Sequence, residues 1–321
     1  MDEGYDAIVV GAGPAGLAAA LTLGRSRRRT LVLDTGNPRN APAEEMHNFF
    51  SRDGEPPAQV RAIAREQVER YPTVEFRDVG AERVVPEDGA FIFALADGGA
   101  ARAQRVLLAT GLADELPPIP GLAELWGRAV FHCPYCHGYE LAGQAVGVVG
   151  SGAPIARLAP QLTRLAGAIR VLTNGAALDD DARALLDEHG VPVEPTPIAR
   201  VHGTDGRLEA LEFAGGERLA LDALYVSPKL RQRSDLAEQL GCARLDDGLV
   251  EVDDLGRTSV PGVFAAGDMA RRAGMPGPAA AVIAAAAGGA VAAAALHQDL
   301  VSSDFGMPAL HAPAPQGAAA G

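Results

Sequence analysis

The sequence predicts an α/β protein of two domains in which one strand, glycine turn, helix and strand pattern occurs twice. The chain has 321 residues, a length that ordinarily makes two domains. The pattern starts at Gly11 and again at Gly150, and an internal repeat of this size indicates two nucleotide-binding-like units. With 48% hydrophobic and 21% charged residues, the composition is typical of a soluble globular protein.

The first copy of the pattern is a G-x-G-x-x-G motif in its full context. An apolar strand at residues 5–10 runs into Gly11, Gly13 and Gly16, a helix follows, and a second strand ends at Asp34. Gly11 makes the turn, Gly13 lets a pyrophosphate approach, and Gly16 lets the helix pack on the strand. Asp34 can then bind a ribose 2′-OH, so this copy predicts a dinucleotide-binding domain.

The segments that follow are assigned from their periodicity. Residues 35–56 are loop-like, and a helix is expected from about Pro57 to Arg70. Short alternating stretches near residues 74–76, 80–85 and 90–95 predict a small β-meander. A buried strand at residues 106–109 then ends at Thr110 and Gly111, and the proline-rich residues 117–120 mark a domain boundary.

The second copy consists of a strand at residues 145–149, a glycine turn, a helix at residues 154–165 and a strand at residues 168–172. A meander is expected from about Val193 to Ser227. Pro278 to Leu296 carries no charge and is long enough to span a membrane. It is mostly Ala and Gly, whose transfer gain is small, so an interior helix is predicted and no membrane partner. The low-complexity tail from Val301 is expected to be mobile.

Between the two copies lies the stretch Phe-His-Cys-Pro-Tyr-Cys-His-Gly-Tyr-Glu at residues 131–140. Cys133 and Cys136 form a C-x-x-C motif, and a thiolate in the first turn of a helix has a lowered pKa and is nucleophilic. His137 is a candidate acid/base, because its ordinary pKa suits proton transfer with thiols at neutral pH. Residues 133–137 also satisfy the C-x-x-C-H pattern of c-type haem attachment, but that chemistry needs an exported chain. A zinc site would need four adjacent ligands on one turn. Neither alternative is favoured.

Charge and cysteine count narrow the function class. The formal net charge is −13, so nucleic-acid partners are not expected. No signal peptide is recognised, and a cytoplasmic location is predicted. Three cysteines in a reducing compartment argue for a catalytic pair plus one inert, buried thiol at Cys242.

Taken together, these pieces resemble the low-molecular-weight thioredoxin reductase family over nearly the whole chain. The motifs that carry the resemblance are the first glycine motif, Leu108 to Gly111, Cys133 to Cys136 and Thr258 to Asp268. The resemblance implies two Rossmann-like, three-layer ββα domains and a homodimer. It implies a discontinuous FAD domain at residues 1–112 plus 245–321, with a middle domain at residues 113–244 that carries the dithiol and a degenerate NAD(P)-type site.

The resemblance also implies roles for individual residues. Cys136 matches the sulfur that faces the flavin and Cys133 the one that exchanges with substrate. FAD is the implied cofactor. The residues that would bind it are Gly11, Gly13, Pro14, Ala15, Gly16, Asp34, Asn40, Asn48, Val84, Thr110, Gly111, Gly267 and Asp268.

Three departures from the family pattern fall on the nicotinamide site. Ile155 stands in the second glycine turn where the family has a small residue. The strand that should lead to a His-Arg-Arg cluster leads to residues 173–176, Thr-Asn-Gly-Ala, which leaves no bidentate cation for a 2′-phosphate. The family's Ile-Gly-x-x-Pro-Asn stretch is replaced by residues 226–231. These losses predict that NADPH binding is gone.

A fourth departure is His137, where thioredoxin reductases have an Asp. The surrounding string is similar to that of FAD-dependent dithiol oxidases of the gliotoxin and holomycin type. This branch implies electron flow from a small-molecule dithiol to the cysteine pair, to FAD and then to O2, giving H2O2. Phe49, Phe50 and Tyr135 are expected to form apolar walls of a substrate cleft. Two alternatives remain: a thioredoxin reductase fed by NADPH or ferredoxin, and a flavin-binding redox sensor without turnover.

Overall fold

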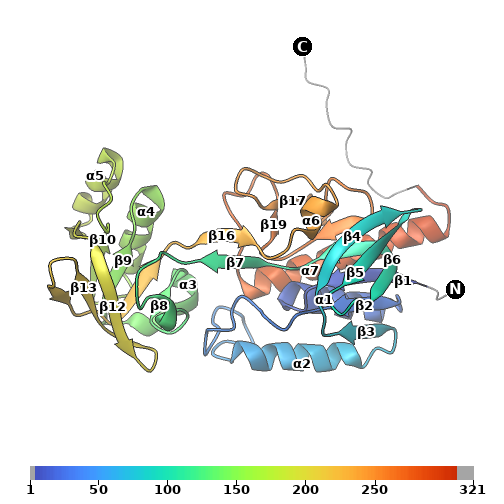
Figure 1. Ribbon diagram of the computed structural model, residues 1–321, viewed down its shortest axis with the longest axis horizontal. Coiled ribbons are helices and arrows are strands. Elements are labelled where there is room, and N and C mark those ends of the chain that lie inside the picture. Colours follow the sequence, from blue (N-terminus) through green and yellow to red (C-terminus); the bar gives the residue numbers. More distant parts are fainter. Residues whose placement is uncertain (1–3, 309–321) are drawn as a thin grey trace, which may run out of the picture. The chain divides into compact units, whose positions relative to one another are not determined.

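The computed structural model describes residues 4–308, which form two compact units (Figure 1). Within that range the first unit contains the residues up to Arg39, Ala58–Ala113 and the residues from Arg231 on. The second contains Asn40–Pro57 and Asp114–Leu230. The predicted α/β fold with two Rossmann-like domains is confirmed.

The first unit is built on a seven-stranded sheet in the order β3-β2-β1-β6-β5-β4, with β18 also paired to β6. Its elements are β1 (Tyr5–Val10), α1 (Pro14–Arg25), β2 (Thr30–Leu33), α2 (Pro57–Glu69), β3 (Val74–Arg77), β4 (Ala81–Glu87), β5 (Ala90–Leu95), β6 (Ala100–Leu108), α6 (Leu236–Gln239), β17 (Val250–Glu251), β18 (Val263–Ala265), β19 (Ala270–Arg271) and α7 (Val282–Asp304). Strands β7 (Leu112–Glu115) and β16 (Lys229–Gln232) pair with each other, and each is divided between the two units.

Strand β6 joins the parallel and antiparallel parts of this sheet. Its first half pairs antiparallel with β5, and its second half, at Val106–Leu108, lies between β1 and β18 in parallel register. Strands of a parallel sheet are covered on both faces, which explains why β1 and β2 are apolar without alternation. The prediction that residues 74–76 belong to a meander is wrong, because β3 pairs parallel with β2.

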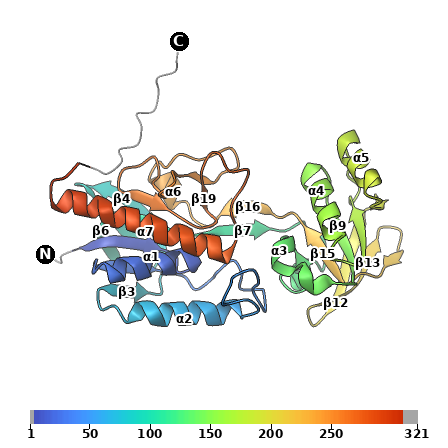
Figure 2. The ribbon, with the colours of Figure 1, turned by 180° about the vertical axis from the view of Figure 1, so that it is seen from behind.

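Helix α7 is the long alanine helix, and it runs alongside α1 (Figure 2). It is long and apolar enough to satisfy a membrane-span test. Its alanines and leucines, however, enter the same core as α1, and a helix with a buried face in a soluble core passes the same test. Residues 301–304 are the last turn of α7, so the tail expected from Val301 begins later; residues 309–321 lie outside the described part of the chain.

The second unit has three layers. A parallel sheet in the order β11-β10-β9-β15-β8 is covered on one face by helices and on the other by the antiparallel sheet β12-β13-β14. Its elements are η1 (Ala123–Leu125), β8 (Val130–Phe131), α3 (Pro134–His137), η2 (Tyr139–Leu141), β9 (Ala145–Val149), α4 (Ala153–Leu162), β10 (Ala168–Leu172), α5 (Asp180–Glu188), β11 (Val193–Glu194), β12 (Ile198–Thr204), β13 (Arg207–Phe213), β14 (Arg218–Leu219) and β15 (Ala223–Val226).

The two units differ from the predicted domain boundaries in two segments. Residues 231–244 group with the first unit, where the Gln239 side chain bonds the backbone of Glu82 and Val84 on β4. Residues 40–57 group with the second unit, where Glu44 pairs with Arg128 at 3.3 Å. In both segments, these contacts join residues that are far apart in the sequence.

Candidate functional site: a dithiol pocket and a dinucleotide turn

The first glycine turn has the geometry that a dinucleotide needs. A Cβ on Gly16 would lie 1.7 Å from the Gly11 carbonyl oxygen, so only glycine lets α1 pack this closely on the turn. A Cβ on Gly13 would meet nothing within 4 Å, which leaves open space in front of the first turn of α1. The Asp34 carboxylate closes the turn by accepting from Ala12 N at 2.8 Å and Gly36 N at 3.0 Å. Open space, free helical N–H groups and an acid at the strand end fit FAD.

Other predicted FAD residues lie in the same unit. Thr110 donates to the Met269 sulfur at 3.2 Å, and Gly111 and Gly267 both have positive φ. Asp268 pairs with Arg39 at 2.8 Å, a partner that the sequence reasoning did not identify. Val84 is buried in β4. Asn40 and Asn48, by contrast, belong to the second unit.

The cysteine pair forms a disulfide at the start of α3 in the second unit. Cys133 and Cys136 have a Cα–Cα distance of 5.3 Å, within the usual disulfide range. Gly138 ends the short helix where no side chain fits, because a Cβ would lie 2.2 Å from the Pro134 carbonyl oxygen. Both cysteines are half-buried, so exposure alone does not distinguish their roles.

His137 follows the disulfide and is enclosed by aromatic and charged groups. Its ring stacks on Phe131 at 4.4 Å between centroids and meets the edge of His47 at 6.3 Å. Burial lowers the pKa of His137 below its ordinary value, and positive charge on His47 acts in the same direction. Glu140 and a hydrogen bond to the Glu45 backbone oppose this shift in pKa only in part. The net result favours a neutral imidazole, which can accept a proton.

His47 is the residue that the sequence reasoning missed. Its side chain is 16% exposed, and its two ring nitrogens face three carboxylates. Nδ1 lies 3.7 Å from Asp53, and Nε2 lies 3.6 Å from Glu45 and 3.5 Å from Glu140. Among residues 4–308, no group of three or more His, Cys, Asp or Glu side chains is arranged to hold a metal ion.

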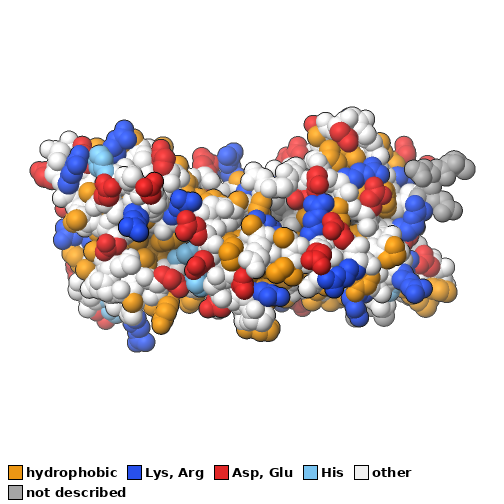
Figure 3. Space-filling model, turned by 90° about the horizontal axis from the view of Figure 1, so that it is seen from below, with side chains coloured by type: hydrophobic (Ala, Val, Ile, Leu, Met, Phe, Trp, Pro, Cys, Tyr) orange, Lys and Arg blue, Asp and Glu red, His pale blue; other side chains and the backbone are white. Residues whose placement is uncertain are grey.

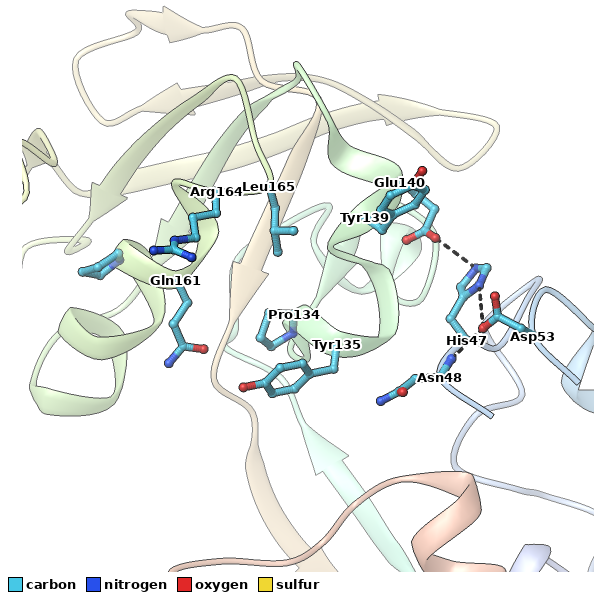
Figure 4. Close-up of a pocket in the computed structure, with 11 residues that line it drawn as sticks. His47, Asn48, Asp53, Pro134, Tyr135, Tyr139, Glu140, Gln161, Arg164 and Leu165 are labelled. Carbon is cyan, nitrogen blue, oxygen red and sulfur yellow. Dashed lines mark hydrogen bonds and ion pairs between the residues drawn. The ribbon is translucent and has the colours of Figure 1, made fainter. Parts of the chain in front are cut away.

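A cavity of about 690 Å³ opens beside the disulfide helix (Figure 4). All of its walls come from the second unit: the segment of residues 40–57, α3, η2 and the end of α4. Tyr135 is one of its walls, as predicted, but Phe49 and Phe50 do not line it, and the Phe50 side chain is 77% exposed. The residues that line the cavity are His47, Asn48, Asp53, Pro134, Tyr135, Tyr139, Glu140, Pro160, Gln161, Arg164 and Leu165.

The second glycine turn has Ile155 at the position that corresponds to Gly16 in the first turn. The Ile155 side chain is 2% exposed in the core under α4, and a Cβ on Gly150 would lie 3.1 Å from it. At the carboxyl end of β10, Asn174 uses its side-chain oxygen to accept from Ile198 N at 2.7 Å. Thr173, just before it, is buried. Ile155 and Asn174 therefore contribute to the packing of the unit itself, whereas the buried Thr173 hydroxyl has no hydrogen-bond partner among the described residues.

Two further predictions concern single groups and the surface. Cys242 is a free, buried thiol whose pKa is raised by burial, and its sulfur lies 3.6 Å from the Thr258 hydroxyl. This environment fits the expectation of an inert cysteine. Acidic and basic side chains alternate over the face in Figure 3, without a continuous basic stripe on that face.

Comparison with known proteins identifies the family. The model of the pyridine nucleotide-disulphide oxidoreductase family matches residues 5–288. Thioredoxin reductase tcpT from Claviceps purpurea is 36% identical over 281 residues, 82% of this chain and 86% of that protein. The structure of HlmI is 40% identical with a TM-score of 0.88, covering 95% of each chain. The putative thioredoxin reductase TrxB from Bacillus anthracis is 32% identical with a TM-score of 0.87, covering 94% of this chain and all of that one.

These matches, the first glycine turn and the cysteine pair all indicate the same family. The chain belongs to the pyridine nucleotide-disulphide oxidoreductase family and is an FAD-dependent thiol-disulfide oxidoreductase of the low-molecular-weight thioredoxin reductase type.

Proposed function

We propose that this enzyme is a dithiol oxidase that closes an intramolecular disulfide in a small-molecule dithiol, with O2 as the final electron acceptor and H2O2 as its product. The observation that carries the proposal is the cavity beside the disulfide helix. Its volume of about 690 Å³ suits a small molecule, and the exposed rings of Tyr135 and Tyr139 offer apolar surface to it. A cytoplasmic location and a homodimer are part of the proposal.

The second glycine turn supports an electron donor other than NADPH. Ile155 stands at the position of Gly16, where a small residue lets the helix pack closely on the strand, and its side chain lies in the core under α4. Asn174 is engaged with the backbone of Ile198, and residues 173–176 carry no cation for a 2′-phosphate. Electrons must then enter through the cysteine pair, and a thiol substrate is their natural source.

The cysteine pair can perform the exchange with balanced atoms. One substrate thiolate attacks the Cys133 sulfur, the Cys133–Cys136 bond breaks, and Cys136 leaves as a thiolate. The second substrate thiolate attacks the substrate sulfur of the mixed disulfide, which releases Cys133 and a cyclic disulfide. His137, whose pKa is lowered by burial, accepts a thiol proton at a ring nitrogen.

FAD would be held by the first unit. Gly13 and the first turn of α1 would bind its pyrophosphate, and Asp34 would bind a ribose. The other predicted contacts, Asn40, Asn48 and Val84 among them, stay predictions. When bound, FAD supplies the acceptor for the two electrons of the reduced cysteine pair and passes them to O2.

Anaerobic titration of the purified yellow protein tests the proposal. A small dithiol is expected to bleach the flavin far faster than NADPH or NADH does. Under air, H2O2 should form with small dithiols faster than with reduced thioredoxin. Rapid stoichiometric bleaching by NADPH, or thioredoxin oxidation at least as efficient as every small dithiol tried, would contradict the proposal.

A thioredoxin reductase is the second candidate, because several similar proteins carry that name. It would draw electrons from NADPH or from another donor such as ferredoxin. The same titration separates the two functions, with reduced ferredoxin as a third reductant.

A further inference from the structure

His47 and His137 meet at the dithiol pocket although they are 90 positions apart in the sequence. His137 comes from the disulfide helix and His47 from the loop at residues 40–57, and the rings contact edge to face. The same loop also bonds His137 through the Glu45 backbone. One short segment therefore contacts the His137 ring at two points.

The loop that carries His47 is fixed by its own hydrogen bonds. Met46 pairs with Glu55 across a β-bridge, and Met46 O accepts from Gly54 N at 2.9 Å. Asn48 has a φ of +62°, in the left-handed region that asparagine adopts more readily than most residues, and its N–H donates to Asp53 at 2.7 Å. Figure 4 shows the result: His47 lies between Asp53 and Glu140 at one end of the pocket.

The His47 ring lies beside three carboxylates and contacts His137 at its edge. Both ring nitrogens face acids at 3.5 to 3.7 Å, and the side chain is largely buried. A positive charge there is balanced by the acids, yet it disfavours a second positive charge on the adjacent ring. Asp53 and Glu140 line the cavity itself, whereas Glu45 approaches from the loop.

We propose that His47 is a positioning residue for the dithiol reaction, which together with the Glu45 backbone holds the His137 ring as a proton acceptor. The inference rests on the proposed function, in which His137 takes a thiol proton. The hydrogen bond from one His137 ring nitrogen to the Glu45 carbonyl fixes the ring, and on the proposed function the other nitrogen accepts the thiol proton. His47 keeps that nitrogen free of a proton by opposing the charged form.

Direct titration of His137 by NMR in the oxidised, FAD-loaded protein tests this without any turnover. Replacing His47 by Gln removes the neighbouring charge, so the His137 midpoint should move up by roughly half a unit to one unit, the size expected for one partly solvated charge about 6 Å away. The variant His47→Lys restores a cation and should bring the midpoint back toward that of the wild type.

The matched control is Glu44→Gln, a charge change in the same loop that pairs with Arg128 instead of facing His137. It should leave the midpoint unchanged. The other groups that face His137 are Glu45, Glu140 and, beneath Phe131, Tyr225, whose pKa is raised by burial; none of them is altered in these variants.

Turnover supplies a second readout. With a small dithiol, the acidic limb of kcat should shift upward in His47→Gln by the same amount, while in a His137→Ala background the His47 substitution should have no further effect. A His137 midpoint that stays the same in a folded, FAD-containing His47→Gln variant would overturn the inference. Because the NMR titration needs no dithiol, this outcome is distinct from a failure of the proposed function.

Discussion

Helix α7 approaches the FAD-binding helix α1 at a glycine, and a pair of adjacent substitutions isolates that contact. A Cβ on Gly289 would lie 2.0 Å from the Ala15 carbonyl oxygen, with two further backbone atoms of Ala15 within 2.8 Å. A Cβ on its neighbour Gly288 would meet only Gly267 N, at 4.0 Å, an ordinary contact. Both glycines are inside α7, so helix propensity alone predicts the same gain of about 1 kcal/mol for alanine at either position.

Because of the contact between Gly289 and Ala15, the two alanine variants should change the free energy of unfolding in opposite directions. Atoms of this kind do not approach closer than about 3 Å, so the two helices in Gly289→Ala must separate by about 1 Å along their contact. Overpacking of a rigid backbone contact costs about 3 kcal/mol, the upper end of the usual range, which outweighs the helix propensity gain. We expect Gly289→Ala to lose about 2 kcal/mol and Gly288→Ala to gain up to about 1 kcal/mol.

Urea unfolding of the two FAD-saturated variants measures this difference, followed by circular dichroism and flavin fluorescence. Gly289→Ala should also bind FAD more weakly, because Ala15 belongs to the first turn of α1, in front of which the pyrophosphate would lie. If Gly289→Ala were as stable as Gly288→Ala, the close approach of the two helices would not be the feature that requires glycine, and the reasoning would be refuted.

Other predictions concern the site itself. His137→Ala should slow turnover by ~10²- to 10⁴-fold at unchanged FAD content, and a rate unchanged from pH 6 to 9 would make His137 structural. Because the pKa of His137 is lowered, its base form persists below pH 6.5, so the acidic limb of the wild-type rate should lie below that value. For the same reason the free energy of unfolding should fall as pH drops below 6.5, and it should fall less in His137→Ala. Cys133→Ser should leave a long-wavelength charge-transfer band, whereas Cys136→Ser should not; the reverse would exchange their roles. The Gly13→Val apoprotein should unfold at an unchanged urea midpoint, but this variant should retain little FAD. Gly16→Ala, by contrast, should fail to fold stably. FAD retention by Gly13→Val would argue against the pyrophosphate site.

The sequence by itself determined the features that depend on neighbouring residues. The first glycine motif, the apolar strands around it and the C-x-x-C pair are local signals, because backbone turns and period-2 or period-3.6 patterns are set within a few residues. Strands at residues 90–95, 145–149 and 168–172 lie where they were predicted. Ile155 was singled out from its position in the repeated pattern alone, and the structure places its side chain in the core under α4; that it obstructs a cofactor stays a prediction.

Only the tertiary structure decided which distant segments share a site. A strand near residue 74 was predicted and is observed, but the sequence indicated a meander partner for it. In the structure β3 pairs with β2, which extends the parallel sheet. Phe49 and Phe50 were expected to line the cleft, yet their neighbour His47 does so, because the Met46–Glu55 bridge and the positive φ of Asn48 set which side chains of the loop face the pocket. His47 carries no motif of its own. Its meeting with His137 follows from the docking of residues 40–57 on the second unit, a contact between segments far apart in the chain that no local pattern encodes.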